Sequence, residues 1–243
     1  MGKAPPYVML MASLPALGPL LSERAPPISE TRLERRLREL SPEDHAELER
    51  LRSLASWNRL DMAEEEAAFL ARARSVIDGV RSPAIRALAQ DRLEIRTLIA
   101  ALRRRHAGEE APAPGTPWGY GRFVETIRSN WGVPDFGVGR AFPWIAAAKE
   151  KLESGDRAGL ERIVLEAAWA AGERRLALHD FDFEAVVLYV LRWSLVDRWS
   201  RYDAEAAAVR FAELLDQALA DSPLADRPIG PTVADPSGIR DAA

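Results

Sequence analysis

The three histidines are the first candidates for metal binding or acid–base chemistry. They are His45, His106 and His179, none stands at zinc-ligand spacing from another, and the chain has no cysteine. The run His179-Asp180-Phe181-Asp182 places an imidazole beside two carboxylates, as a metal site or an acid–base pair requires. The run also fits a helix boundary, with His179 at the negative end of one helix and Asp182 capping the next. We favour the boundary and expect no bound metal or cofactor.

Two further patterns match known sites only in part. Gly137-Val138-Gly139 lacks the further glycine of a dinucleotide-binding loop, and the chain has no Gly-Lys-Ser or Gly-Lys-Thr for a phosphate loop. We interpret it as a flexible loop. In Glu64-Glu65-Glu66 consecutive carboxylates would point about 100° apart on a helix, so they indicate a solvated first turn and not a metal site. We therefore expect no catalytic residue and a protein that is not an enzyme.

Arginines form the strongest candidate binding surface. Residues 81–106 contain seven arginines against Asp91 and Glu94, in a chain of net charge −4. Arg92, Arg96 and Arg103 are four and eleven residues apart, which places them along one side of a helix. Such a row is either a solvated helix face or a docking surface for an acidic protein partner. We predict the docking surface at these three arginines as a hypothesis.

The composition narrows the class of protein. At 243 residues the chain is long enough for a substantial core, and its acidic balance gives no general attraction to nucleic acid. The apolar N-terminal run loosely resembles a signal peptide, but Pro5, Pro6, Pro15 and Pro19 interrupt it. We expect a cytoplasmic protein without a membrane anchor of its own.

The longest apolar stretch, Phe181–Tyr202, predicts the central element. Its apolar residues cover most of a helix circumference, so other helices or a partner must cover it. Glu184, Arg192, Asp197 and Arg198 make insertion into a bilayer costly. We predict a central helix over 182–202 of a helical bundle, with Asp203 beginning the next helix.

Capping residues and apolar periodicity predict the other helices, and no segment shows the alternation of a strand. The fold class is therefore all-α. The predicted organisation is an N-terminal helical half over 1–107, a Pro/Gly-rich linker over 108–119, a C-terminal half over 120–221 and a disordered tail over 222–243. The apolar segment from Tyr7 to Leu17 should pack on the bundle, either as a strand or as a helix. The predicted helices outside 182–202 span about 29–40, 41–56, 61–78, 82–106, 120–130, 142–153, 156–178 and 203–220.

Several stretches together resemble a bacterial family encoded beside V/A-type ATPase genes. The resembling stretches follow the family's order over residues 7–220. The most specific are the first, which begins at Tyr7, and the last, which begins at Phe181. At position 97 the family leads us to expect asparagine, where this chain has Thr97. The stretches are Tyr7–Leu17 with Pro26–Ser29, Leu40–Asp44, Arg92–Thr97 with Leu102-Arg103, and Phe181–Tyr189 with Asp197–Trp199.

The family is similar in turn to the C subunit of bacterial and archaeal V/A-type rotary ATPases, which is named the d subunit in eukaryotes. The resemblance implies an all-helical bundle of the C-subunit type, a non-catalytic part of a proton- or sodium-translocating complex. It would couple the central stalk to the membrane rotor ring at the cytoplasmic face of the inner membrane. Its partners would be other ATPase subunits, with no nucleic acid and no direct membrane insertion.

Two other functions stay open at the level of sequence. One is a soluble helical adaptor or regulator that binds an acidic protein through the Arg92 side or through aromatic residues around Trp131 and Trp144. The other is a helical enzyme with a carboxylate site, which would need titratable groups that converge in the fold.

Overall fold

The computed structural model describes residues 6–22, 25–55, 66–176 and 178–220, with only the helical backbone for 203–220. Every regular element in these ranges is a helix, which confirms the all-α prediction. The helices are α1 Val8–Ser13, α2 Glu30–Leu37, α3 Pro42–Ala55, α4 Glu66–Asp78, α5 Pro83–His106, α6 Val124–Ser129, α7 Ile145–Glu153, α8 Arg157–Leu176 and α9 Phe183–Ala220.

Local signals in the sequence set several of these helix ends. Ser82 caps α5 by accepting the Ile85 N–H, and Ser41 accepts the Asp44 N–H at the start of α3. After α5, Gly108 adopts φ +80, the left-handed conformation that ends many helices. The predicted start of the 61–78 helix lies outside the described residues, as do Glu64, Glu65 and the predicted tail over 222–243.

The chain divides into two units, Met1–Tyr202 and Asp203–Ala243. The first unit contains both sides of the linker over 108–119, because residues before and after that linker share one hydrophobic core. The prediction that Asp203 begins a new helix is wrong, since α9 is a single helix from Phe183 to Ala220. The alanine- and glutamate-rich residues after Asp203 are strong helix formers, so nothing local breaks the helix there.

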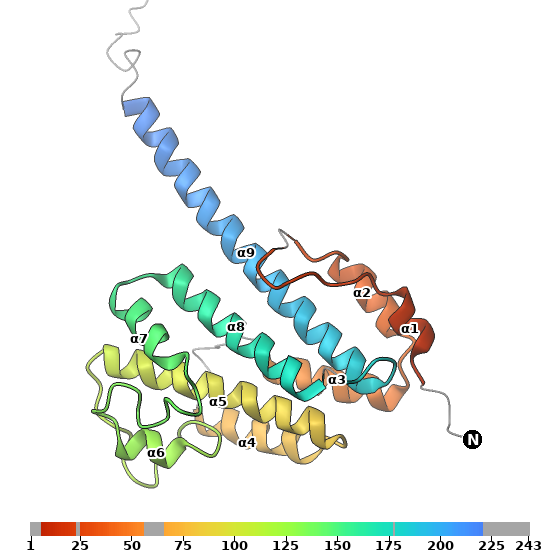
Figure 1. The fold of residues 1–243 in the computed structure, drawn as a ribbon, viewed down its shortest axis with the longest axis horizontal. Coiled ribbons are helices and arrows are strands. Elements are labelled where there is room, and N and C mark those ends of the chain that lie inside the picture. The colour runs from red at the N-terminus through yellow and green to blue at the C-terminus, as the bar shows by residue number, and fades with distance from the viewer. Residues whose placement is uncertain (1–5, 23–24, 56–65, 177, 221–243) are drawn as a thin grey trace, which may run out of the picture. The chain divides into compact units, whose positions relative to one another are not determined.

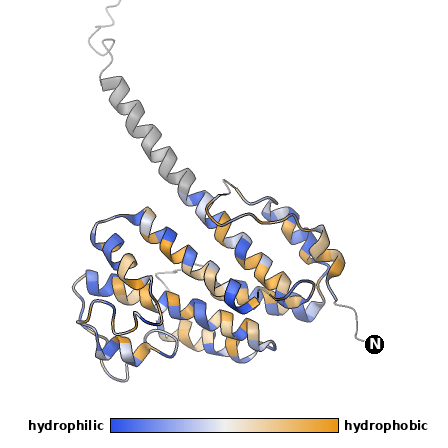
Figure 2. Ribbon diagram, viewed as in Figure 1, coloured by the Kyte–Doolittle hydropathy of each residue, from blue (hydrophilic) through white to orange (hydrophobic). Residues whose placement is uncertain are grey.

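Within the first unit, α8 lies alongside α5, and the first half of α9 packs between α8 and the N-terminal helices (Figure 1). Apolar residues follow this part of α9, as Figure 2 shows. From Phe183 to Trp193 they belong to a core cluster with α1, α2 and α3, and Leu195 and Val196 belong to a second cluster with α5, α7 and α8. The predicted central helix is thus covered by its neighbours over both clusters.

The apolar N-terminal segment packs on α9, as predicted. It begins with a helix, α1, and its buried residues Tyr7, Leu10 and Leu14 join the α9 cluster. Two side chains of α9 donate hydrogen bonds to carbonyls of the non-helical chain that follows α1. Tyr189 Oη donates to the Pro15 carbonyl at 2.9 Å, and Trp193 Nε1 donates to the Ile28 carbonyl at 2.7 Å.

Candidate functional site

The predicted arginine surface on α5 differs from what the spacing suggested. Arg92 is only 6% exposed, Arg96 is half-buried with its guanidinium 3.6 Å from the centre of the Phe69 ring, and only Arg103 is exposed. The three side chains do lie along one side of α5. At Arg92 that side faces α3 and α9, and at Arg96 it faces Phe69 of α4, so the accessible docking face predicted at Arg92 is not present.

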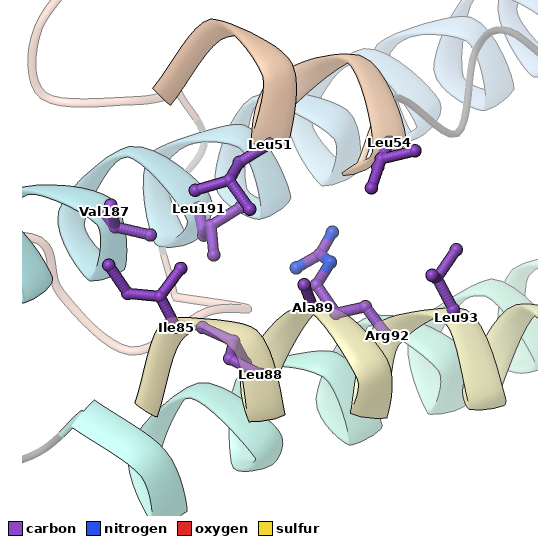
Figure 3. Close-up of a pocket in the computed structure, with 9 residues that line it drawn as sticks. All are labelled: Leu51, Leu54, Ile85, Leu88, Ala89, Arg92, Leu93, Val187 and Leu191. Carbon is purple, nitrogen blue, oxygen red and sulfur yellow. The ribbon is translucent and has the colours of Figure 1, made fainter. Parts of the chain in front are cut away.

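Arg92 instead lies in a small apolar pocket between α3, α5 and α9 (Figure 3). The pocket has a volume of about 20 Å³, enough for one water molecule. Burial, together with the nearby positive charge of Arg198, lowers the pKa of Arg92 to about 10. Arg92 is therefore a residue of the protein interior. The other residues around the pocket are Leu51, Leu54, Ile85, Leu88, Ala89, Leu93, Val187 and Leu191.

Polar residues on another side of α5 fix the end of the 108–119 linker. Glu94 accepts the Arg122 backbone N–H at 2.9 Å and both Nε and Nη2 of the Arg122 side chain at 2.9 Å. Thr97 Oγ1 accepts the Tyr120 N–H at 2.7 Å. At the start of α4, Glu66 accepts the Gly119 N–H at 3.0 Å, so this member of the predicted solvated turn is a structural residue. These contacts close the linker onto α5.

A buried ion pair joins α8 to α9. Glu161 of α8 is only 8% exposed, and both of its carboxylate oxygens contact Arg198 of α9, with Nη2 3.0 Å from Oε2. Arg192 of α9 pairs with Glu173, also on α8. A buried carboxylate is stable in a protein interior when it is paired in this way. The two pairs therefore fix the register of the two helices.

A third polar cluster anchors the start of the described chain. The Tyr7 hydroxyl donates to Asp44 and accepts the Ser41 N–H at 3.2 Å. Arg81, just before α5, contacts Asp44 and donates from Nε to the buried carboxylate of Glu47 at 2.7 Å. Hydrogen bonds from Tyr7 and Arg81 lower the pKa of Asp44 against the opposing effect of its burial. The cluster thus connects the N-terminal segment to α3 and α5.

The His179–Asp182 run is a helix boundary, as we favoured. Asp182 Oδ1 accepts the Ala185 N–H at 2.9 Å as the cap of α9, and its Oδ2 lies 2.6 Å from His179 Nδ1. With Glu184, these residues offer three ligand atoms within 4.8 Å of one another, all on half-buried side chains. Imidazole nitrogen and carboxylate oxygens can bind a divalent cation. The Asp182 carboxylate, however, already accepts the Ala185 N–H and contacts His179.

The loop that holds Gly137-Val138-Gly139 is built around a buried aromatic ring. Phe136 is fully buried with φ +53, and Arg105 of α5 stacks 4.0 Å from the centre of its ring. Arg105 also donates to the carbonyls of Trp131, Val133 and Pro134. Asp135 accepts the N–H groups of both glycines. The backbone donors that would bind a phosphate in this loop are thus occupied by Asp135.

Taken together, the charged groups of the first unit mainly join its elements to one another. The site residues predicted from the sequence did not include four buried carboxylates, Glu47, Asp91, Glu94 and Glu161. Their signal in the sequence is a carboxylate among apolar helix positions. In the part of the chain that the structure covers, no helix combines the length and apolar character needed to cross a membrane. Comparisons with protein-family models, with curated proteins and with solved structures find no match for this chain.

Proposed function

We propose that this chain is a non-catalytic member of a rotary V/A-type ATPase. In this role, like that of the C subunit, it couples the central stalk to the membrane rotor ring. The supporting observation is that the two most specific stretches of the family resemblance contact each other directly. The Tyr7 N–H donates to the Phe181 carbonyl at 3.0 Å, and the Tyr189 hydroxyl donates to the Pro15 carbonyl. Residues that carry the resemblance at its two ends therefore pack against each other in the fold.

The mechanism is transmission of torque through a stiff helical body. Close-packed interiors transmit strain because they compress little. In the first unit, ion pairs between helices add to this packing, with Arg175 to Asp91 joining α8 to α5 and Arg198 to Glu161 joining α9 to α8. Such a protein needs one surface for the stalk and another for the ring. It would act at the cytoplasmic face of the inner membrane, and the complex would carry protons or sodium ions.

The alternative of an adaptor that binds an acidic partner through the Arg92 side loses its main support. Arg92 is buried and Arg96 is engaged with Phe69, so the arginine row offers a partner little beyond Arg103. The substitution Arg92→Glu would place a carboxylate in the core and would not report on partner binding. We therefore retain the rotary ATPase as the proposed function.

Co-purification tests the proposal. The catalytic subunit of the ATPase is tagged in the native host, the intact complex is isolated in mild detergent, and its proteins are quantified by mass spectrometry. We expect this chain at a fixed ratio to the central-stalk subunits. A matched strain in which the tag is placed on an unrelated membrane complex is the control. An intact, active ATPase preparation that lacks this chain would reject the proposed function.

A further inference from the structure

The non-helical chain that follows α1 lies against α9 (Figure 1). Residues 14–22 of this chain are called the strap below. Leu14 and Leu20 of the strap are buried, and Leu17 packs against both the α9 cluster with α1, α2 and α3 and the second cluster with α5, α7 and α8. The strap therefore contributes apolar side chains to both core clusters, and its burial favours the position seen in the structure.

Few hydrogen bonds hold the strap to the rest of the chain. Among the described residues, its one hydrogen bond to another element is that from the Tyr189 hydroxyl to the Pro15 carbonyl. The strap N–H groups that donate within the described chain are those of Leu14 and Ser22, and each donates to a carbonyl three residues earlier. Pro15 and Pro19 have no N–H, and solvent hydrates the remaining donors. Segments with few tertiary bonds and a hydrated backbone are those that open locally in folded proteins.

A hollow of about 260 Å³ lies between the strap and α9. The strap side of the hollow is formed by residues 14–17, and the α9 side includes Ala185, Leu188 and Arg192. The hollow has room for several water molecules, so the strap and α9 are incompletely packed here. Side chains that line a gap lose the dispersion contacts of a close-packed interior. Lifting the strap therefore breaks fewer contacts than separating two packed helices.

The chain on both sides of the strap is anchored to helices. Just before the strap, Arg36 of α2 donates to the Ser13 carbonyl at 2.7 Å. After the strap, Trp193 of α9 donates to the Ile28 carbonyl at 2.7 Å. The strap can therefore move away from α9 while α1 and Ile28 keep their contacts.

We propose that the strap opens and closes over α9 while the helices of the first unit stay folded. In the closed state, burial of Leu14 and Leu20 holds the strap in place. In the open state, these two leucines and Leu188 of α9, which lines the hollow, reach solvent. The strap thus controls access to an apolar stretch of α9. This inference goes beyond the proposed function and does not depend on it.

Thiol labelling of the full chain tests this inference, because the chain has no cysteine of its own. Leu20→Cys places a single thiol in the strap, and Leu165→Cys places the control thiol in α8, at a buried leucine of the same core cluster. Iodoacetamide labels a buried thiol through its open form. The labelling rate follows the population of that form when reclosing is fast. Circular dichroism checks that each variant is folded, and Leu14→Cys is a second strap position.

Two further substitutions distinguish opening of the strap from unfolding of the first unit. Asp91→Asn weakens the ion pair between α5 and α8, which stays intact when only the strap opens. It should speed the labelling of Leu165→Cys about thirtyfold and that of Leu20→Cys less than about twofold. Tyr189→Phe removes the hydrogen bond to the Pro15 carbonyl, so it should speed the labelling of Leu20→Cys about fivefold.

Equal acceleration of the two thiols by Asp91→Asn would overturn the inference, because the strap would then open only when the whole unit unfolds. A labelling rate of Leu20→Cys that Tyr189→Phe leaves unchanged would also overturn it. So would a rate equal to that of the same variant unfolded in urea, since the strap would then not be closed at all. If Leu20→Cys does not fold, the same outcomes apply to Leu14→Cys.

Discussion

Arg175, near the end of α8, and Asp91, in the middle of α5, form a bidentate ion pair between these two neighbouring helices. Arg175 Nε lies 2.9 Å from Asp91 Oδ2, and Nη2 lies 3.1 Å from Oδ1. Asp91 is almost fully buried, whereas Arg175 reaches solvent. The pair therefore fixes the register of α5 against α8.

The first prediction concerns this pair. Asp91→Asn should lower the free energy of unfolding by about 2 kcal/mol, because the amide cannot accept two hydrogen bonds from the guanidinium in the same way. Urea denaturation followed by circular dichroism measures the change. Glu166→Gln, which removes an exposed carboxylate paired with Arg162 on the same α8, should cost less than about 0.5 kcal/mol. Equal effects of the two substitutions would contradict a structural role for Asp91.

The second prediction concerns the close approach to α5 of the chain just after the 108–119 linker. A Cβ on Gly121 would lie 2.3 Å from Glu94 Cγ, and the residue has φ +116. Gly121→Ala should therefore destabilise the protein by about 2 kcal/mol or more, through both strain and displacement of Glu94. Gly115→Ala, also at positive φ but with no atom within 4 Å of its Cβ, should cost about 1 kcal/mol. The denaturation midpoints of the two variants measure this difference in stability. If Gly121→Ala destabilises the protein no more than Gly115→Ala, the chain after the linker does not pack against Glu94 as described.

The sequence predicted most helices because their ends carry explicit signals. Ser82-Pro83 and Gly108 bound α5, and Asp182 begins α9 where expected. Periodicity did not reveal which side of α5 faces inward. Apolar residues and arginines alternate around that helix, and only the tertiary structure shows that α3 and α9 cover Arg92. A long side chain with an apolar stem fits such a position as well as it fits a surface.

The contacts of the candidate site residues were harder to predict because their partners are far away in the sequence. The roles of Glu94, Glu161 and Thr97 depend on residues 23 or more positions away, such as Tyr120 and Arg198. Spacing within one helix cannot identify partners of that kind. By contrast, the cap at Asp182 is a local interaction, and its local sequence was sufficient to predict it.

The third prediction concerns alkaline pH. Burial raises the pKa of Tyr189 to about 12, partly offset by the nearby Arg36. The stability that depends on its neutral hydroxyl is complete below about pH 10, the pKa of an unfolded tyrosine, and is lost as the pH rises toward 12. The free energy of unfolding of the unmodified chain should therefore fall more steeply between pH 10 and 12 than that of Tyr189→Phe. Urea titrations at several pH values compare the slopes. Parallel curves would show that Tyr189 ionises as freely in the folded chain as in the unfolded one.

The fourth prediction concerns the attachment of the N-terminal segment to α9. Trp193→Phe keeps most of the buried ring but removes the donor to the Ile28 carbonyl, which should cost about 1–3 kcal/mol. Hydrogen exchange of amides near Ile28 should speed up, while amides of α7 should not change. The control is Trp144→Phe, at a half-buried tryptophan before α7. Unchanged exchange near Ile28 in Trp193→Phe would mean that the segment is held by other contacts.

The coupling of ATP hydrolysis to ion transport tests the central claim most directly. ATP-driven ion uptake and ATP hydrolysis are measured on inverted membrane vesicles from a strain that lacks this chain and from the same strain supplied with it. If this chain couples the stalk to the ring, ATP hydrolysis should persist in the strain that lacks it while ion uptake is lost. Supplying the full chain should restore ion uptake. Ion uptake of the same rate per ATP hydrolysed in both strains would contradict the account.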